Sequence, residues 1–258
     1  MSAGTIEERV ADIHRFFEDD SIDALWCTGG GNTANELLDH LDYDLIHAHP
    51  KLFIGLSDNS VLLNAIMKHT GLITIHGTDP KLGSGYFDDE YTHRELVTRL
   101  ERGEIGTIPE SDPRETVRSG RGEGVLVGGK MSRILKTAGT DFFPKTDGAI
   151  LLLEGYLTDL WWTLALLAQL RQMGVFERIA GLVVGNIYAF DHDEQKDVDG
   201  KRISFEELLL RASEGYDFPI LKIREAGHKC PSTFLPIGGK VKMDADAQTL
   251  EITEPFLS

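Results

Sequence analysis

Apolar and polar positions follow helix and strand periods in turn along the first third of the chain. Apolar residues at spacings of three and four predict a helix at the start, formed by Ile6, Val10, Ile13, Phe16 and Phe17. Short apolar runs then predict strands at 23–27, 50–55 and 71–76, with helices after the first two. Strands that alternate with helices predict a parallel sheet with helices on its faces.

The pattern changes twice after this first unit. Residues 79–123 are charged and rich in Gly, Pro, Asp and Arg, and we interpret them as a connector. Beyond them, apolar runs predict strands at 124–129, 148–153, 179–185, 219–223, 239–243 and 249–252, with a helix over 158–173. The predicted fold is α/β, with a Rossmann-like parallel-sheet N-terminal domain over 1–78 and a smaller α/β C-terminal domain with mixed strands over 124–258.

Composition and charge narrow the classes of function. The 258 residues include 42 Asp and Glu against 26 Lys and Arg, a net charge of −16. So acidic a surface repels phosphate backbones and anionic lipids, which disfavours nucleic-acid and membrane partners. The longest uncharged apolar stretch, 160–170, is far shorter than the roughly 20 residues of a membrane-spanning helix. The start has no secretory pattern, so a cytoplasmic location is predicted, with Cys27 and Cys230 as free thiols.

Two segments approach cofactor or metal motifs without completing them. Residues 124–130 fit the G-x-x-x-x-G-K part of a phosphate loop, but Met131 stands where a magnesium-binding Ser or Thr is needed. The acidic run 191–200 would place the neutral Gln195 at the first ligand position of a calcium loop. No two histidines have the spacing of a zinc site. We therefore predict neither a metal nor a cofactor.

The strongest local feature is the segment 55–58, Gly-Leu-Ser-Asp, where an apolar strand turns abruptly into a helix. This is the geometry of a nucleophile elbow, in which the hydroxyl of Ser57 stands out at the end of the strand. The same residues also make a good helix N-cap. A nucleophilic serine needs a base and an orienting carboxylate. Glu154, which ends an apolar strand, and His228, in a later turn, are the candidates; a helix-capping acid and a surface histidine are the alternatives.

The sequence resembles the LD-carboxypeptidase and microcin C self-immunity family of serine peptidases, and the matching segments occur in the same order along the chain. The resemblance is carried by segments 8–13, 29–46, 50–58, 71–77, 150–154, 181–185 and 227–238. Within it, residues 29–46 are closest to the microcin-immunity branch.

The resemblance implies a role for each matching residue. Ser57 is the nucleophile, His228 the general base and Glu154 the orienting acid, with backbone N–H groups of Asp58 and Gly30 as the oxyanion hole. The site would then lie between the two domains. The implied activity is hydrolysis of a non-standard amide bond in a small peptide or peptidyl nucleotide, by a homodimer without a cofactor. A microcin-immunity-like amidase acting on peptidyl or aminoacyl nucleotides competes with a murein tetrapeptide LD-carboxypeptidase.

Some positions depart from the family pattern. Leu56 replaces a residue that is usually aromatic, and Lys130 stands where a small amide usually follows the two glycines. Trp161 and Trp162 could offer an aromatic surface to a nucleobase, but the helix pattern predicts that they form a buried face.

The start of the chain also departs from the family. The family's opening strand, helix and strand has no counterpart before Glu8, so we expect a shortened first domain or a start set too far downstream. A missing sheet edge would weaken the domain that holds Ser57. The alternative of another class is therefore a non-catalytic ligand-binding protein on the same fold.

Overall fold

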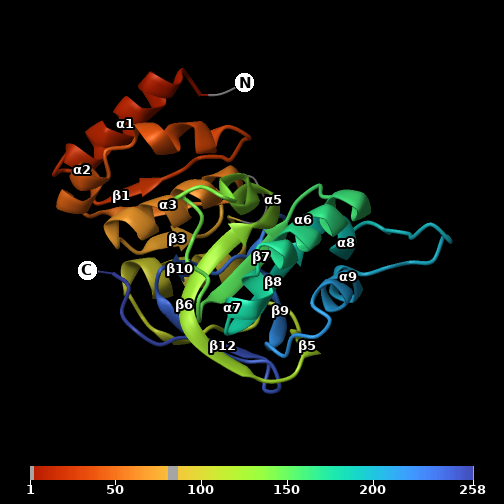
Figure 1. The fold of residues 1–258 in the computed structure, drawn as a ribbon. Helices are drawn as coiled ribbons and strands as arrows, with labels where there is room; N and C mark the ends of the chain where they lie inside the picture. The colour runs from red at the N-terminus through yellow and green to blue at the C-terminus, as the bar shows by residue number, and fades with distance from the viewer. Residues whose placement is uncertain (1–2, 81–86, 258) are drawn as a thin grey trace.

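The computed structural model describes residues 3–80 and 87–257 and contains two sheets covered by helices (Figure 1). The first sheet has the strand order β1 (Ala24–Trp26), β2 (Leu52–Gly55), β3 (Thr74–His76), β10 (Leu235–Ile237), with β10 antiparallel to β3. Its helical segments are α1 (Ile6–Glu18), η1 (Ala34–His40), α2 (Tyr43–Ala48), η2 (Ser57–Asn59) and α3 (Ser60–Thr70). The predicted parallel pairing of the first three strands is confirmed.

The second sheet is larger and mixed. Its strand order is β4 (Gly106–Thr107), β12 (Thr249–Ile252), β11 (Lys240–Asp244), β6 (Arg121–Lys130), β7 (Ile150–Gly155), β8 (Gly181–Ile187), β9 (Ile220–Gly227), β5 (Glu115–Arg118). The four central strands, β6 to β9, are parallel, and the outer ones are antiparallel. The predicted α/β class with mixed strands is therefore confirmed.

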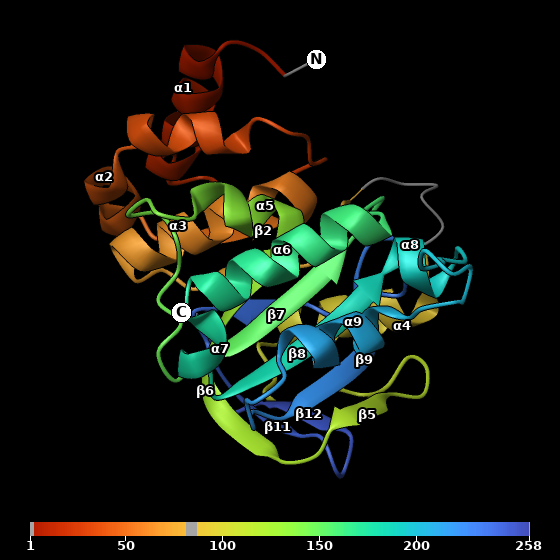
Figure 2. The same ribbon diagram turned by 45° about the vertical axis from the view of Figure 1, so that its right-hand side comes forward.

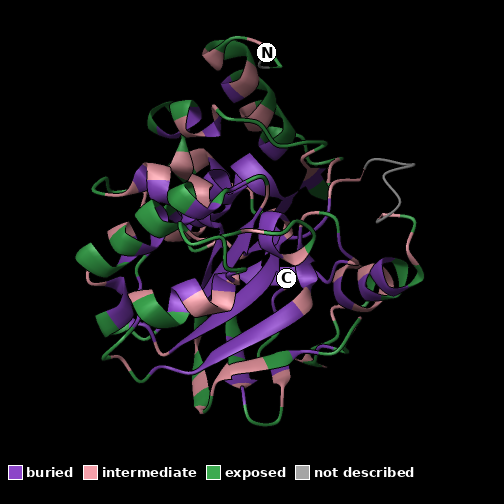
Figure 3. Ribbon diagram, turned by 90° about the vertical axis from the view of Figure 1, so that its right-hand side faces the viewer, coloured by how far each residue is buried: buried purple, intermediate pink, exposed green. Residues whose placement is uncertain are grey.

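Helices cover this second sheet. They are α5 (Met131–Ile134), η4 (Leu135–Thr137), α6 (Leu160–Gln172), α7 (Val175–Arg178), α8 (Tyr188–Asp191) and α9 (Phe205–Ala212). Figure 2 shows α6, α7 and α9 lying across one face of β7, β8 and β9. Strands β7 and β8 are buried along their whole length, which explains their nearly continuous apolar sequences, and Figure 3 shows buried strands running through the centre of the sheet.

Chain segments cross between the two sheets in a way that the apolar pattern did not predict. Strand β10 lies late in the chain but pairs with β3 of the first sheet. It has three residues, one of them Pro236, so it offers no alternation to detect. The predicted connector 79–123 contributes β4 and β5 to the second sheet. It also contains the helix α4 (Glu90–Glu95) and the π-helical turn η3 (Leu96–Glu101).

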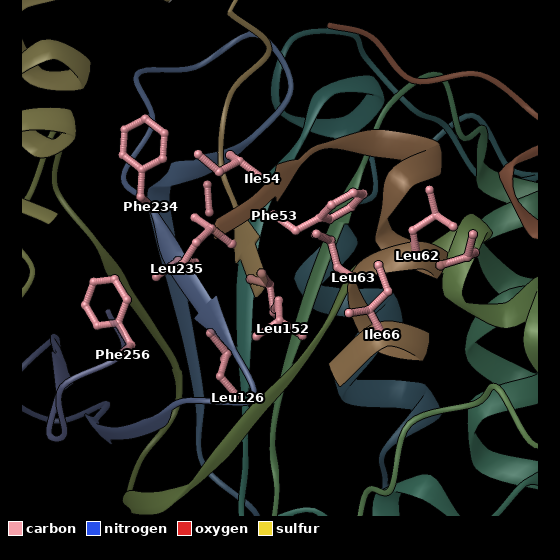
Figure 4. Packing of buried hydrophobic residues seen from close by; sticks show 14 of the residues in the cluster. Phe53, Ile54, Leu62, Leu63, Ile66, Leu126, Leu152, Phe234, Leu235 and Phe256 are labelled. Atoms are coloured by element: carbon pink, nitrogen blue, oxygen red, sulfur yellow. The ribbon is translucent and has the colours of Figure 1, made fainter. Parts of the chain in front are cut away.

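One hydrophobic cluster joins the two sheets (Figure 4). Phe53 of β2 and Leu63 of α3 belong to the same buried group as Leu126 of β6, Leu152 of β7 and Phe234 before β10. All five side chains are almost completely buried. Because close-packed interiors transmit displacement, this cluster fixes the position of the first sheet relative to the second.

Cys27 and Cys230 are free, and burial raises the pKa of each thiol to about 12, so neither is a reactive thiolate at neutral pH. Within residues 3–80 and 87–257, every helix is too short or too polar to cross a membrane. The same residues include no cluster of three His, Cys, Asp or Glu side chains that could hold a metal ion.

Candidate active site

Ser57 lies on a tight turn between β2 and α3. Its φ is 66°, in the left-handed region that residues other than glycine rarely adopt, and such backbone strain is concentrated at functional sites. Gly55 makes the turn possible, because a Cβ at this position would lie 2.7 Å from the Cβ of Asn59. The local sequence thus gives Ser57 the strained strand-to-helix geometry of a nucleophile elbow.

The glycine loop after β1 lies directly against Ser57. A Cβ at Gly30 would be 2.6 Å from the Cβ and 2.7 Å from the Oγ of Ser57, and 3.2 Å from the backbone nitrogen of Asp58. Two hydrogen bonds hold the loop in place: Asn59 Nδ2 donates to the carbonyl of Gly29 at 3.1 Å, and Ala34 N donates to Asp58 Oδ2 at 2.8 Å. Only glycine allows the loop backbone to come so close to the serine hydroxyl.

Glu154 and His228 meet at the carboxyl ends of β7 and β9. The Oε2 of Glu154 lies 2.7 Å from Nδ1 of His228. Glu154 is fully buried, and Gly185 and Gly227 make room for it, since a Cβ at either would come within about 3.3 Å of its Cβ. Burial by itself would raise the pKa of Glu154, but the charge and hydrogen bond of His228, together with His76 and Lys130, outweigh burial and lower this pKa below its usual value. Glu154 is therefore an ionised partner for the histidine.

Two further residues hold His228, one at its backbone and one at its ring. Asn186, at the end of β8, donates from Nδ2 to the carbonyl of His228 at 2.8 Å. The ring of Tyr156 stacks on the imidazole with centroids 4.9 Å apart and planes 8° apart. Because Nδ1 faces a carboxylate, Nδ1 carries the proton and Nε2 is left as the base. Sequence reasoning missed both residues, although each follows closely after a glycine at a strand end.

The structure brings Ser57 together with Lys130. The Nζ of Lys130 donates to Ser57 Oγ at 3.3 Å, and in the described part of the chain no hydrogen bond joins Ser57 to His228. The two pairs are nevertheless neighbours. Lys130 is opposite Glu154 in the pairing of β6 with β7, and its Nζ lies 5.6 Å from the centroid of the Tyr156 ring that covers His228.

Comparison with known proteins identifies this arrangement. Residues 1–77 match the model of the LD-carboxypeptidase N-terminal domain, and residues 123–243 match that of the LD-carboxypeptidase C-terminal domain. The chain belongs to the LD-carboxypeptidase family. The resemblance inferred from the sequence is thereby confirmed.

Individual relatives of this LD-carboxypeptidase family chain come from both branches. A Bacillus subtilis protein, "Probable murein peptide carboxypeptidase", is 32% identical over 97% of this chain and 77% of its own length. The microcin C7 self-immunity protein MccF of Escherichia coli is 29% identical over 99% of this chain and 81% of its own length. The structure of MccF in complex with aspartyl sulfamoyl adenosine superposes with a TM-score of 0.87 at 28% identity, over 99% of this chain and 83% of that one.

The cavity beside Ser57 in this family member is cationic. It has a volume of about 480 Å³ and is lined by Lys130, Arg133 and Lys136, while its described lining includes no carboxylate. Asp58 lies behind this wall, with its Oδ1 3.2 Å from Lys136 Nζ and 3.7 Å from Arg133 Nε. Three cations in one small cavity stand out in a chain whose net charge is −16.

The prediction that Trp161 and Trp162 form a buried helix face is wrong. They are 61% and 55% exposed, and Trp162 lines the cavity beside Ser57. The buried face of α6 is made instead by Leu160, Thr163, Leu166, Leu167 and Leu170. Because α6 is apolar almost all round, its sequence does not reveal which side meets the sheet. The side chain of Trp162 is thus available to a substrate.

His76, at the end of β3, is a further titratable group behind the site. It is buried, and neither ring nitrogen has a hydrogen-bond partner. Burial lowers its pKa from 6.5 to about 4, against an opposing effect of the Glu154 charge. His76 is therefore neutral at pH 7. In the sequence, His76 was noted only as part of the family segment 71–77. Its place at the end of an apolar strand was the signal that could have indicated a buried histidine.

We expect His76→Gln to reduce the loss of stability on acidification. Between pH 6.5 and pH 4 the unfolded chain binds a proton at residue 76 that the folded chain does not, so stability falls as the pH falls through this window. The wild type should lose about 2 kcal/mol more unfolding free energy between pH 7 and pH 5 than the variant. Urea unfolding at both pH values measures the difference, with the exposed His40→Gln as control. Equal losses in wild type and His76→Gln would contradict the assignment.

Proposed function

We propose that this LD-carboxypeptidase family chain is a serine hydrolase with Ser57 as nucleophile, His228 as general base and Glu154 as orienting acid. The observation that carries the proposal is the 2.7 Å contact between buried Glu154 and His228 Nδ1. This contact leaves Nε2 of His228 free to accept a proton. The strained Ser57 lies in the same group of side chains, connected to His228 through Lys130 and Tyr156.

In this mechanism Ser57 Oγ bonds to the carbonyl carbon of the scissile amide as its proton passes to Nε2 of His228. Glu154 holds Nδ1–H and stabilises the imidazolium. The imidazolium then protonates the leaving nitrogen, the C–N bond breaks, and an acyl ester remains on Ser57. Water, deprotonated by His228, hydrolyses this ester. Because a hydroxyl has two lone pairs and one proton, the hydrogen bond from Lys130 leaves the Ser57 proton free for His228.

The tetrahedral intermediate needs donors for its oxyanion. We assign them to the backbone N–H of Asp58, next to the nucleophile, and the N–H of Gly30 in the adjoining loop. The closeness of a Cβ at Gly30 to both Ser57 Oγ and Asp58 N supports this assignment. Each such donor contributes about a hundredfold or more in rate.

For the substrate we favour an aminoacyl or peptidyl nucleotide, as in the microcin-immunity branch. The exposed Trp162 can stack on a nucleobase, and the cations of the same cavity suit a phosphate. MccF, a relative over almost the whole chain, has been solved with aspartyl sulfamoyl adenosine and with glutamyl sulfamoyl guanosine. The second candidate is murein tetrapeptide LD-carboxypeptidase activity, which the 32% identity to the Bacillus subtilis relative favours.

A serine-reactive fluorophosphonate tests the hydrolase, and two substrates test the branch. We expect the probe to label the wild-type chain at Ser57 and to leave Ser57→Ala unlabelled. We also expect cleavage of the amide of an aspartyl-adenylate phosphoramidate. An unlabelled Ser57 in the folded chain would favour the non-catalytic binding protein. Release of D-Ala from a murein tetrapeptide without cleavage of the nucleotide would reverse the choice of branch.

Three expectations stay predictions. They are the homodimer that the family resemblance implies, the cytoplasmic location, and the division into domains over 1–78 and 124–258. None of them enters the proposed mechanism.

A further inference from the structure

Lys130 is held rigidly at the end of β6. Gly128 and Gly129 precede it with φ values of 112° and 128°, and a Cβ at Gly128 would lie 2.2 Å from the carbonyl oxygen of Leu152. The backbone nitrogen of Lys130 then donates to Ser60 Oγ, at the start of α3, at 3.1 Å. The backbone therefore directs the Lys130 side chain toward the turn that carries Ser57.

The ammonium of Lys130 is buried without a counter-ion. The residue is 4% exposed, and among the described residues no carboxylate oxygen lies within 4 Å of Nζ. Its hydrogen bond goes to the neutral Ser57 Oγ, and the Tyr156 ring lies 5.6 Å away. Burial lowers the pKa of Lys130, with the charge of Glu154 opposing the effect. An ammonium has three donors and a buried charge requires a partner, so this one is incompletely satisfied.

The remaining charges of the cavity do not supply that partner. Asp58 is already engaged by Lys136 and Arg133. Arg133 itself has a buried Nε without a hydrogen bond. The wall facing Ser57 therefore carries more positive than negative charge, and an anionic ligand would balance it.

We propose that Lys130 is a specificity-determining residue that binds an acidic group of the substrate, a carboxylate or a phosphoryl, next to the scissile amide. Nζ is 3.3 Å from Ser57 Oγ. An oxygen bound to Nζ at about 2.8 Å must lie within about 6 Å of the nucleophile. A carboxylate on the leaving amino acid and a phosphoryl on the leaving nitrogen both meet this limit. The inference rests on the proposed function and narrows its substrate class.

The test compares matched substrates in wild type, Lys130→Met and Lys130→Arg. One pair shares a neutral acyl group and differs in its leaving group, D-alanine or D-alaninamide; a third substrate carries the same acyl group on the phosphoramidate of adenosine. We expect Lys130→Met to lower kcat/KM for an acidic substrate roughly 30-fold more than for the amide, mainly through KM. Lys130→Arg should retain the preference. The acidic substrate that suffers the selective loss, carboxylate or phosphoryl, identifies the source of the anion.

Other outcomes overturn the inference. An equal loss of kcat on D-alanine and D-alaninamide substrates would place Lys130 in proton transfer, and equal rates in all three proteins would make it structural. The exposed Lys145→Met, outside this cavity, is the matched control. Calorimetry with the D-alanine and D-alaninamide ligands adds a readout that does not need turnover. Binding that prefers the carboxylate only when Lys130 is present, in a chain that hydrolyses nothing, would support the anion site and reject the hydrolase.

Discussion

Replacing Glu154 by Gln is expected to lower kcat by about 10⁴-fold while the chain stays folded. Gln keeps the shape of the side chain but removes the charge that stabilises the imidazolium of His228. It can also turn its NH₂ toward Nδ1 and so fix the wrong tautomer. The fold should tolerate the change, because Oε1 of Glu154 has no hydrogen-bond partner to lose. Steady-state kinetics on the preferred substrate and thermal unfolding measure the two effects.

The matched control for this prediction is Glu206→Gln. Glu206 is also a largely buried carboxylate, but it pairs with Lys222, which keeps Asp191 as a second partner. It should therefore show near wild-type kcat. If Glu154→Gln kept kcat within tenfold of wild type, Glu154 would not be the orienting acid of the reaction.

Gly30→Ala is expected to reduce hydrolysis by about 10²- to 10³-fold and to slow fluorophosphonate labelling of Ser57 to a similar extent. The added methyl would lie 2.6 Å from the Cβ of Ser57 and 2.7 Å from its Oγ. Neither distance is tolerable, so the loop must withdraw and take its N–H away from the oxyanion position. The rate of substrate cleavage measures the loss of hydrolysis, and the rate of fluorophosphonate labelling measures the loss of Ser57 reactivity.

The neighbouring Gly29→Ala provides the control. A Cβ at Gly29 would meet no atom within 4 Å, so the same chemical change one residue away should leave both rates near those of wild type. A Gly30→Ala variant as active as Gly29→Ala would remove Gly30 from the oxyanion hole. A loss in both variants would point to general loosening of the loop.

Much of the site follows from local sequence. The turn at Ser57 is set by an apolar strand, a glycine that avoids the Asn59 side chain, and a helix that begins at once, all within a few residues. The position of Glu154 at a strand end follows equally from the apolar run before it. These are effects of neighbouring residues, so periodicity and turn chemistry were enough to predict them.

Other features depend on contacts between distant segments. The exposed face of α6 is decided by which side meets the sheet, and apolar residues on every side hide that choice from the sequence. Strand β10 is recognised only by its pairing with β3, because three residues carry no period.

The sequence by itself determined the α/β class, the family, the strained turn at Ser57 and the strand-end position of Glu154. The tertiary structure decided which groups those residues meet: His228 lies 74 residues after Glu154, and Lys130 lies 73 residues after Ser57. The physical reason is that backbone turns respond to adjacent side chains, whereas these contacts join distant segments. The Glu154–His228 contact is set by strand order and register across β7 to β9, and the Ser57–Lys130 contact by the packing of the first sheet and α3 against β6.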